Sequence, residues 1–285
     1  MSRLSLRDFC IFCIIIFAWI FWVPIICMIC FSFSALLLFI FPMSYIACRE
    51  AVRTPRIHKN SLLRTALSSI PWHQWFRTDC LNYKYSKNTS LFVHPHGLMC
   101  LGTLSLIHFV PGSNTILAVS PFLFYIPFFG WLLPWAGVVP ATKRGIVLVM
   151  QSDSNLLILP GGVPEIICGE RGVQTFFLRQ RMGIFKLAFA HKQTVLPIVI
   201  KNEEKMYNLI SLPCKIQRLF LSWSCNIPLC FPWFGGIWGS FIPHRVHLEV
   251  KVAEAVRGSA ASSFLPFKNL YMRSLTTMAP LAKIL

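Results

Sequence analysis

The sequence predicts an α/β fold with a mainly parallel sheet, flanking helices and an N-terminal membrane element. Short apolar runs typical of buried strands alternate with longer helical patterns, which indicates the α/β body. Turn-forming proline and glycine residues separate these runs. Apolar residues make up 55% of the 285 residues and the mean hydropathy is +0.60, which is too high for an ordinary soluble domain and indicates the membrane element.

The membrane element is an uncharged run of 33 residues from Phe9 to Phe41. It is too long for the apolar core of a signal peptide, and it falls between the about 20 residues of one helical span and the about 40 of two. Basic residues flank it on both sides, which favours two cytosolic ends. We therefore expect a re-entrant hairpin bent near Pro24, with a single tilted span as the alternative. The chain then divides into an anchor (1–48), a basic linker (49–87) and an α/β body (88–285).

Within the body, buried strands are expected at 90–93, 155–159, 195–200 and 247–252. Helices are expected at 98–110, 180–192 and 270–281, and a further helix follows Lys143-Arg144 and ends at Ser152. Residues 116–141 are apolar, but four prolines break them. There we expect short helices that lie on the bilayer or line an acyl-chain groove, with a proline-broken core as the alternative.

The net charge and the cysteines indicate which kinds of binding partner to expect. The formal net charge of +17 favours an anionic membrane surface or an anionic substrate. Nucleic acid is disfavoured, because the sequence has no basic recognition helix, zinc-finger spacing or stacking strand. Cys10-x-x-Cys13 and Cys27-x-x-Cys30 have zinc-site spacing but lie in the apolar run, where thiolates are costly. We expect no metal, no disulfide framework and a body that faces the reducing cytosol.

Two histidines stand at the first predicted strand-to-helix turn, His94-Pro95-His96-Gly97. Histidine moves protons near neutral pH, and a helix start offers free backbone N–H groups. Pro95 restricts the backbone between the histidines, and Gly97 permits a tight turn. The turn is therefore a candidate for acid–base chemistry, with two ordinary turn histidines as the alternative.

A second turn, Pro160-Gly161-Gly162-Val163-Pro164-Glu165, follows the strand at 155–159. Glycines after a strand let the backbone approach a ligand or another segment closely. Glu165 is one of only ten acidic residues, so its place beside a strand end makes it a candidate site residue. A solvated loop carboxylate is the alternative.

These motifs resemble the type 2 diacylglycerol acyltransferase family, which includes monoacylglycerol and wax alcohol acyltransferases. Residues 94–97 resemble its HPHG motif, and residues 161–165 resemble its GGxxE stretch. Residues 181–188 with 196–198 are similar to its R-x-G-F-x-K-x-A…VP block, and Glu203 matches the glutamate that ends it. The resemblance covers roughly residues 80 to 280 and extends to the N-terminal anchor.

The chain also departs from the family pattern. Lys201-Asn202 stand where the family usually has Phe-Gly, and Ala253-Glu254-Ala255 replace a late G-x-P. The helix after the first motif lacks the usual asparagine. These departures motivate a second hypothesis, a non-catalytic lipid-binding or lipid-droplet protein with the fold of an acyltransferase, whereas the intact histidine pair and Glu165 speak against it.

The resemblance implies a glycerolipid-acyltransferase-like fold and acyl transfer from acyl-CoA to a lipid hydroxyl, with diacylglycerol as acceptor to give triacylglycerol. Monoacylglycerol and fatty (wax) alcohol are alternative acceptors. It implies an endoplasmic reticulum membrane protein with its catalytic domain in the cytosol, with lipid droplets as a further location. Acyl-CoA is a co-substrate, and no cofactor is expected. The partners are then acyl-CoA, a neutral lipid and the bilayer, and homo-oligomerisation stays open.

The resemblance also implies roles for individual residues. We expect His96 to be the base because it lies nearer the helix start, and His94 to be structural or auxiliary. Related glycerolipid acyltransferases have an Asp five residues after the histidine, but Met99 and Leu101 stand there, so we expect Glu165 to be the orienting acid. The expected substrate-binding residues combine glycines of the two turns with cations for the phosphates of CoA: Gly97, Gly161, Gly162, Lys143, Arg144, Arg181 and Lys186.

Overall fold

The structure of the protein is a computed structural model. The structure describes residues 34–57, 76–77, 88–97, 100–109, 115–126, 129–167, 172–208, 243–244, 246–258 and 263–285. The proposed hairpin bend at Pro24 therefore lies outside the described residues.

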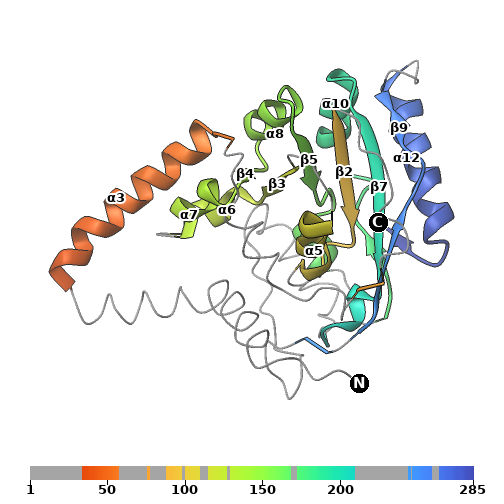
Figure 1. Ribbon diagram of the computed structural model, residues 1–285, viewed down its shortest axis with the longest axis horizontal. Coiled ribbons are helices and arrows are strands. Elements are labelled where there is room, and N and C mark those ends of the chain that lie inside the picture. The colour runs from red at the N-terminus through yellow and green to blue at the C-terminus, as the bar shows by residue number, and fades with distance from the viewer. Residues whose placement is uncertain are drawn as a thin grey trace.

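The core of the molecule is a mixed sheet with the strand order β1-β8-β7-β2-β5-β3-β4, and β9 also pairs with β7. Strands β4, β3, β5, β2 and β7 run parallel, whereas β8 and β9 run antiparallel to β7. The mainly parallel sheet that the sequence predicts is confirmed (Figure 1). The strands are β1 (Phe76–Arg77), β2 (Thr89–His94), β3 (Thr115–Val119), β4 (Val138–Pro140), β5 (Asn155–Ile158), β7 (Thr194–Lys201), β8 (Leu248–Val252) and β9 (Val256–Arg257).

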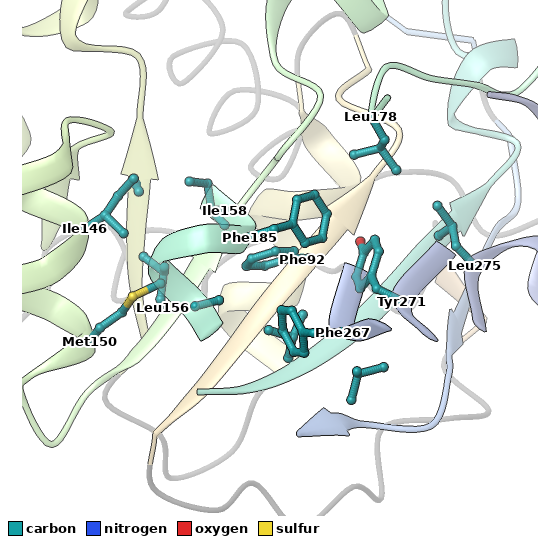
Figure 2. Close-up of a cluster of buried hydrophobic side chains, with 14 of the residues drawn as sticks. Phe92, Ile146, Met150, Leu156, Ile158, Leu178, Phe185, Phe267, Tyr271 and Leu275 are labelled. Atoms are coloured by element: carbon teal, nitrogen blue, oxygen red, sulfur yellow. The ribbon is translucent and has the colours of Figure 1, made fainter. Parts of the chain in front are cut away.

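Helices cover both faces of this sheet, and the alternation of side chains along β2 separates two cores. Leu91 and Val93 pack in one cluster with residues of α5 (Leu101–Phe109), α6 (Pro121–Phe124) and α7 (Phe129–Trp135). Phe92 packs in the other, with residues of α8 (Lys143–Met150), α10 (Gly183–Ala190) and α12 (Phe264–Met278). Figure 2 shows this second cluster, in which Phe92, Phe185 and Tyr271 lie together.

Four short elements complete the fold near these strand ends. Helix α9 (Val163–Ile167) follows β5, and the 3₁₀ turn η2 (Glu203–Lys205) follows β7. Strands β6 (Thr175–Phe176) and β10 (Lys283–Ile284) form a separate parallel pair. The C-terminal segment is thereby attached beside the segment that leads into α10.

The proline-broken region differs from the prediction. It contains the expected short helices α6 and α7, but also strands β3 and β4, which the apolar pattern did not predict. A short apolar run buried on both faces has no distinctive period, so a strand resembles a piece of buried helix. The prolines are accommodated at the first residue of α6, within α7, and at the end of the edge strand β4.

Two helices also have bounds that the sequence did not predict. Helix α12 starts at Phe264, six residues before the predicted start. Helix α3 (Ser34–Arg53) crosses the boundary that we placed at residue 48 and packs against α6 and α7 (Figure 1). In this contact the rings of Tyr45 and Tyr125 lie 6.0 Å apart. Among the described helices, none combines the length and the apolar character needed to cross a bilayer.

Candidate active site

The two sequence motifs meet at one edge of the sheet. Strands β2 and β5 are parallel neighbours, with Phe92 paired to Ile158, so their carboxyl ends lie side by side. His94 is the last residue of β2, and Glu165 lies in the first turn of α9, directly after β5. Carboxyl ends of parallel strands are the usual place for sites in α/β folds.

The ring of His94 is completely buried and has a partner on each nitrogen. Its Nδ1 lies 3.1 Å from Glu165 Oε1, and its Nε2 lies 2.8 Å from the hydroxyl of Tyr271 on α12. A carboxylate only accepts, so Nδ1 carries the proton, and Nε2 accepts from the Tyr271 hydroxyl. Both ring nitrogens are thereby engaged inside the protein, and His94 has no lone pair left for a substrate.

The carboxylate of Glu165 connects three segments. Besides His94, it accepts a hydrogen bond from the backbone N–H of His96 at 2.8 Å and from the backbone N–H of Phe177 at 3.0 Å. Glu165 is only 4% exposed, and every partner that the structure gives it is an N–H donor. Gly161 makes this possible, because a Cβ at that position would collide with the Glu165 carboxyl group.

His96 differs from His94 in exposure and in bonding. It is partly exposed, and its Nδ1 lies 2.9 Å from the carbonyl oxygen of Gly97, which can only accept. Nδ1 therefore carries the proton and Nε2 holds the lone pair. The Cys100 sulfur lies 3.3 Å from Nδ1 and 3.8 Å from Nε2. Burial lowers the pKa of His96 below its ordinary value, so the ring is neutral at pH 7.

The expected role of Glu165 needs one correction. We predicted that it would orient the ring of His96, but its carboxylate contacts the ring of His94 and only the backbone of His96. The reason is the strand period: His94 shares the face of Phe92, toward α12, whereas His96 lies beyond the end of the strand. Glu165 therefore holds the turn that carries His96.

The predicted cations divide into two groups. Arg181 is half-buried at the glycine turn, where its Nη2 donates to the Gly161 carbonyl oxygen at 3.2 Å and its guanidinium lies over the Phe177 ring. Lys143, Arg144 and Lys186 are exposed in the first turns of α8 and α10. Helix α8 follows β4 and α10 precedes β7, so both helices begin on the side of the sheet where the histidines lie.

The glycines predicted to bind substrate have a structural role in this arrangement. Gly97 and Gly162 have φ values of +60° and +61°, in the region that favours glycine. Gly161 leaves space for the carboxyl group of Glu165, and Gly97 does so for that of Glu203. Among the described residues, no group of three His, Cys, Asp or Glu side chains is placed to hold a metal ion.

Sequence reasoning missed Tyr271. It lies on α12, far along the chain from the motifs, and its ring packs against Phe92 and Phe185 with centroids 5.7 Å and 4.9 Å away (Figure 2). The available signal was the stripe Phe267, Tyr271 and Leu275, spaced four residues apart. A tyrosine on a buried helix face needs a partner for its hydroxyl.

One departure from the family pattern has a physical explanation. Asn202 adopts φ +68° directly before Glu203, a left-handed conformation that glycine adopts easily. Asparagine is among the few other residues that tolerate it. The replacement of glycine by Asn202 therefore keeps the turn that places Glu203.

The family model and the similar curated proteins point to the same family. The family model described as "Diacylglycerol acyltransferase" matches residues 28–259. Bovine 2-acylglycerol O-acyltransferase 1 is 29% identical over 139 residues, which are 45% of this chain and 42% of the relative. Zebrafish diacylglycerol O-acyltransferase 2 is 23% identical over 191 residues, 60% of this chain and 53% of the relative. The matched regions thus span about half the length of these curated relatives.

Among solved structures, the crystal structure of the 1-acyl-sn-glycerophosphate acyltransferase PlsC from Thermotoga maritima is similar to this chain. It covers 96% of this chain and 98% of its own, with 13% identity and a TM-score of 0.43. That score is too low to support an argument about the site.

Proposed function

The chain belongs to the diacylglycerol acyltransferase family, and on that premise we propose that it transfers a fatty acyl group from acyl-CoA to a hydroxyl group of an acylglycerol. The acceptor that we favour is diacylglycerol, which would give triacylglycerol. Monoacylglycerol and fatty (wax) alcohol are the alternative acceptors, and the family relation supports the reaction class more strongly than the choice among them.

The observation that carries the proposal is the contrast between the two histidines. His94 uses both ring nitrogens inside the protein, whereas His96 is partly exposed, with Nδ1 on the Gly97 carbonyl oxygen and an unprotonated Nε2. An alcohol is a weak nucleophile until a base removes its proton, and a neutral imidazole nitrogen does this near pH 7. His96 is therefore the base, and His94 is a positioning residue.

His96 Nε2 takes the proton of the acceptor hydroxyl while its oxygen attacks the thioester carbonyl carbon. The tetrahedral intermediate collapses with cleavage of the carbon–sulfur bond, and the imidazolium returns the proton to the CoA sulfur. Backbone N–H groups at the start of α5, after Gly97, are the expected donors to the intermediate's oxygen. Arg181, Lys143, Arg144 and Lys186 are the expected partners of the CoA phosphates.

We place the reaction at the cytosolic face of a membrane, with the endoplasmic reticulum as the expected location. Large apolar side chains are exposed on the adjacent helices α3 and α7: Met43 and Ile46 are 66% and 59% exposed, and Leu132 and Trp135 are 56% and 53% exposed. Arg49 and Arg53 lie toward the C-terminal end of α3. Apolar side chains beside basic ones fit a bilayer with anionic headgroups.

The test compares His96→Ala with His247→Ala, a matched change of an exposed histidine directly before β8. Microsomes from a host that lacks neutral lipids receive radiolabelled acyl-CoA with diacylglycerol, monoacylglycerol or fatty alcohol, and thin-layer chromatography identifies the product. We expect His96→Ala to abolish acyl transfer while the amount of protein in the microsomal membranes stays unchanged. We expect His247→Ala to retain acyl transfer. Full turnover by His96→Ala would refute the assignment of the base. Lipid binding without product from the wild type across the panel would favour the non-catalytic lipid-binding hypothesis.

A further inference from the structure

A second buried carboxyl group lies beneath the turn that carries His96. Glu203 is 4% exposed and lies at the start of η2, directly after β7. Its Oε1 accepts a hydrogen bond from the backbone N–H of Gly102, in the first turn of α5, at 3.3 Å. Its Oε2 is buried and has no hydrogen-bond partner in the part of the chain that the structure describes.

Two glycines show how closely this carboxyl group approaches the turn. A Cβ at Gly97 would collide with the Glu203 carboxyl group, and a Cβ at Gly102 would lie 3.0 Å from Oε2. The carbonyl oxygen of Gly97 is the acceptor for His96 Nδ1. Glu203 therefore lies against Gly97, whose carbonyl oxygen sets the tautomer of His96, and against the first turn of α5.

The surroundings of Glu203 oppose a negative charge. Burial raises its pKa to about 8, and the nearby carboxylates of Glu204 and Glu165 add to the effect, while the Gly102 N–H acts in the opposite direction. Two further titratable groups of the described residues interact with it, Cys100 directly before α5 and Tyr207 after η2, and both are neutral at pH 7 because burial raises their pKa values. A pKa of about 8 favours the neutral acid at pH 7, and because Oε1 accepts the Gly102 N–H, we infer that Oε2 carries the proton.

We propose that Glu203 is a positioning residue that works in its protonated form: neutral, it holds the Gly97 turn and the start of α5 in place, and ionised, it prevents acyl transfer. This inference rests on the proposed function. The start of α5 carries the positive end of a nine-residue helix, where negative charge develops on the thioester oxygen. An ionised Glu203 would place a competing anion at the same helix end and repel that charge.

The substitution Glu203→Gln tests this inference directly. A glutamine side chain has nearly the same shape, keeps an oxygen for the Gly102 N–H, supplies an N–H₂ where Oε2 carries its proton, and never ionises. We expect its acyl transfer rate at pH 7 to stay within about threefold of wild type. The wild-type rate at pH 9 should fall to roughly a tenth of its value at pH 7, as for a required acid with a pKa of about 8, whereas the Glu203→Gln rate should not fall.

The matched control is Glu249→Gln, the same change at a half-exposed carboxylate on β8, which should keep the alkaline loss of activity. Glu203→Leu removes the acceptor for the Gly102 N–H and should lose activity at every pH. If Glu203→Gln is inactive at pH 7 while folded, or keeps the wild-type alkaline loss, the inference is overturned.

Infrared difference spectra between pH 7 and pH 9 give a readout that needs no turnover. The wild type should lose a protonated-carboxyl band that Glu203→Gln lacks. Absence of that band from the wild type overturns the inference whatever the activity. Presence of the band in a wild type with no transfer over the acceptor panel refutes the proposed function, and with it the role of Glu203 in transfer.

Discussion

Replacing Glu165 with glutamine should damage both the fold and the reaction, in contrast to the same change at Glu203. Both Glu165 oxygens accept from N–H donors: His94 Nδ1 and the Phe177 N–H share Oε1, and the His96 N–H binds Oε2. Glutamine has only one acceptor oxygen, so in either amide orientation its N–H₂ group faces at least one buried donor. One charge-assisted bond is lost and one donor is left unsatisfied.

The expected loss of stability and of acyl transfer rate follows from these contacts. A hydrogen bond to a charged group contributes about 1.5–3 kcal/mol, and an unsatisfied buried donor costs about 1–3 kcal/mol. We expect Glu165→Gln to lower the free energy of unfolding by about 3 kcal/mol, which corresponds to a fall in Tm of roughly 5–10 °C. If a similar free energy is lost from the positioning of His96, the acyl transfer rate falls about 100-fold.

The assay measures Tm by tryptophan fluorescence in detergent and transfer from radiolabelled acyl-CoA, with Glu249→Gln as the control for the chemical change. Wild-type Tm together with a rate within threefold of wild type would refute the reasoning, because it would mean that the three N–H donors do not need a carboxylate.

Two further predictions follow from the same buried groups. Tyr271→Phe removes the donor to His94 Nε2 and should lower Tm by a few degrees and the transfer rate roughly tenfold, with unchanged KM for acyl-CoA; a normal rate would show that His94 needs no second partner. The pKa of Glu203 rises from 4.5 to about 8 on folding, so the folded state binds the extra proton between those pH values. Wild-type stability should therefore fall as pH rises from about 4.5 to 8, by on the order of 5 kcal/mol, and level off above. Glu203→Gln should lack this dependence of stability on pH. Urea unfolding at pH 5, 7 and 9 measures the free energy of unfolding of both proteins, and an equal decrease in the two would contradict the prediction.

The sheet strands that carry the site were predictable for a simple reason. The runs at 90–93, 155–159 and 195–200 are apolar, short and followed by turn residues, and they correspond to β2, β5 and β7. Strands β3 and β4 were not predicted, because a buried run between prolines has the same composition whether it is strand or helix. The antiparallel direction of β8 was also not predictable, because its pattern does not depend on the direction of its neighbour.

The sequence by itself identified the candidate groups for chemistry. A histidine pair at a strand end, a rare glutamate after two glycines and a strong excess of positive charge are local properties, so they can be read from neighbouring residues. The family motifs and the family membership follow from the same local patterns.

Only the tertiary structure decided how those groups are arranged around one another. It places Tyr271 of α12 on His94, directs Glu165 to the ring of His94 and the backbone of His96, and buries Glu203 under Gly97. Each of these contacts joins segments 69 to 177 residues apart or depends on the space that a glycine leaves. Hydrogen bonding and burial at such separations depend on strand order and helix packing, and local sequence patterns carry no information about either.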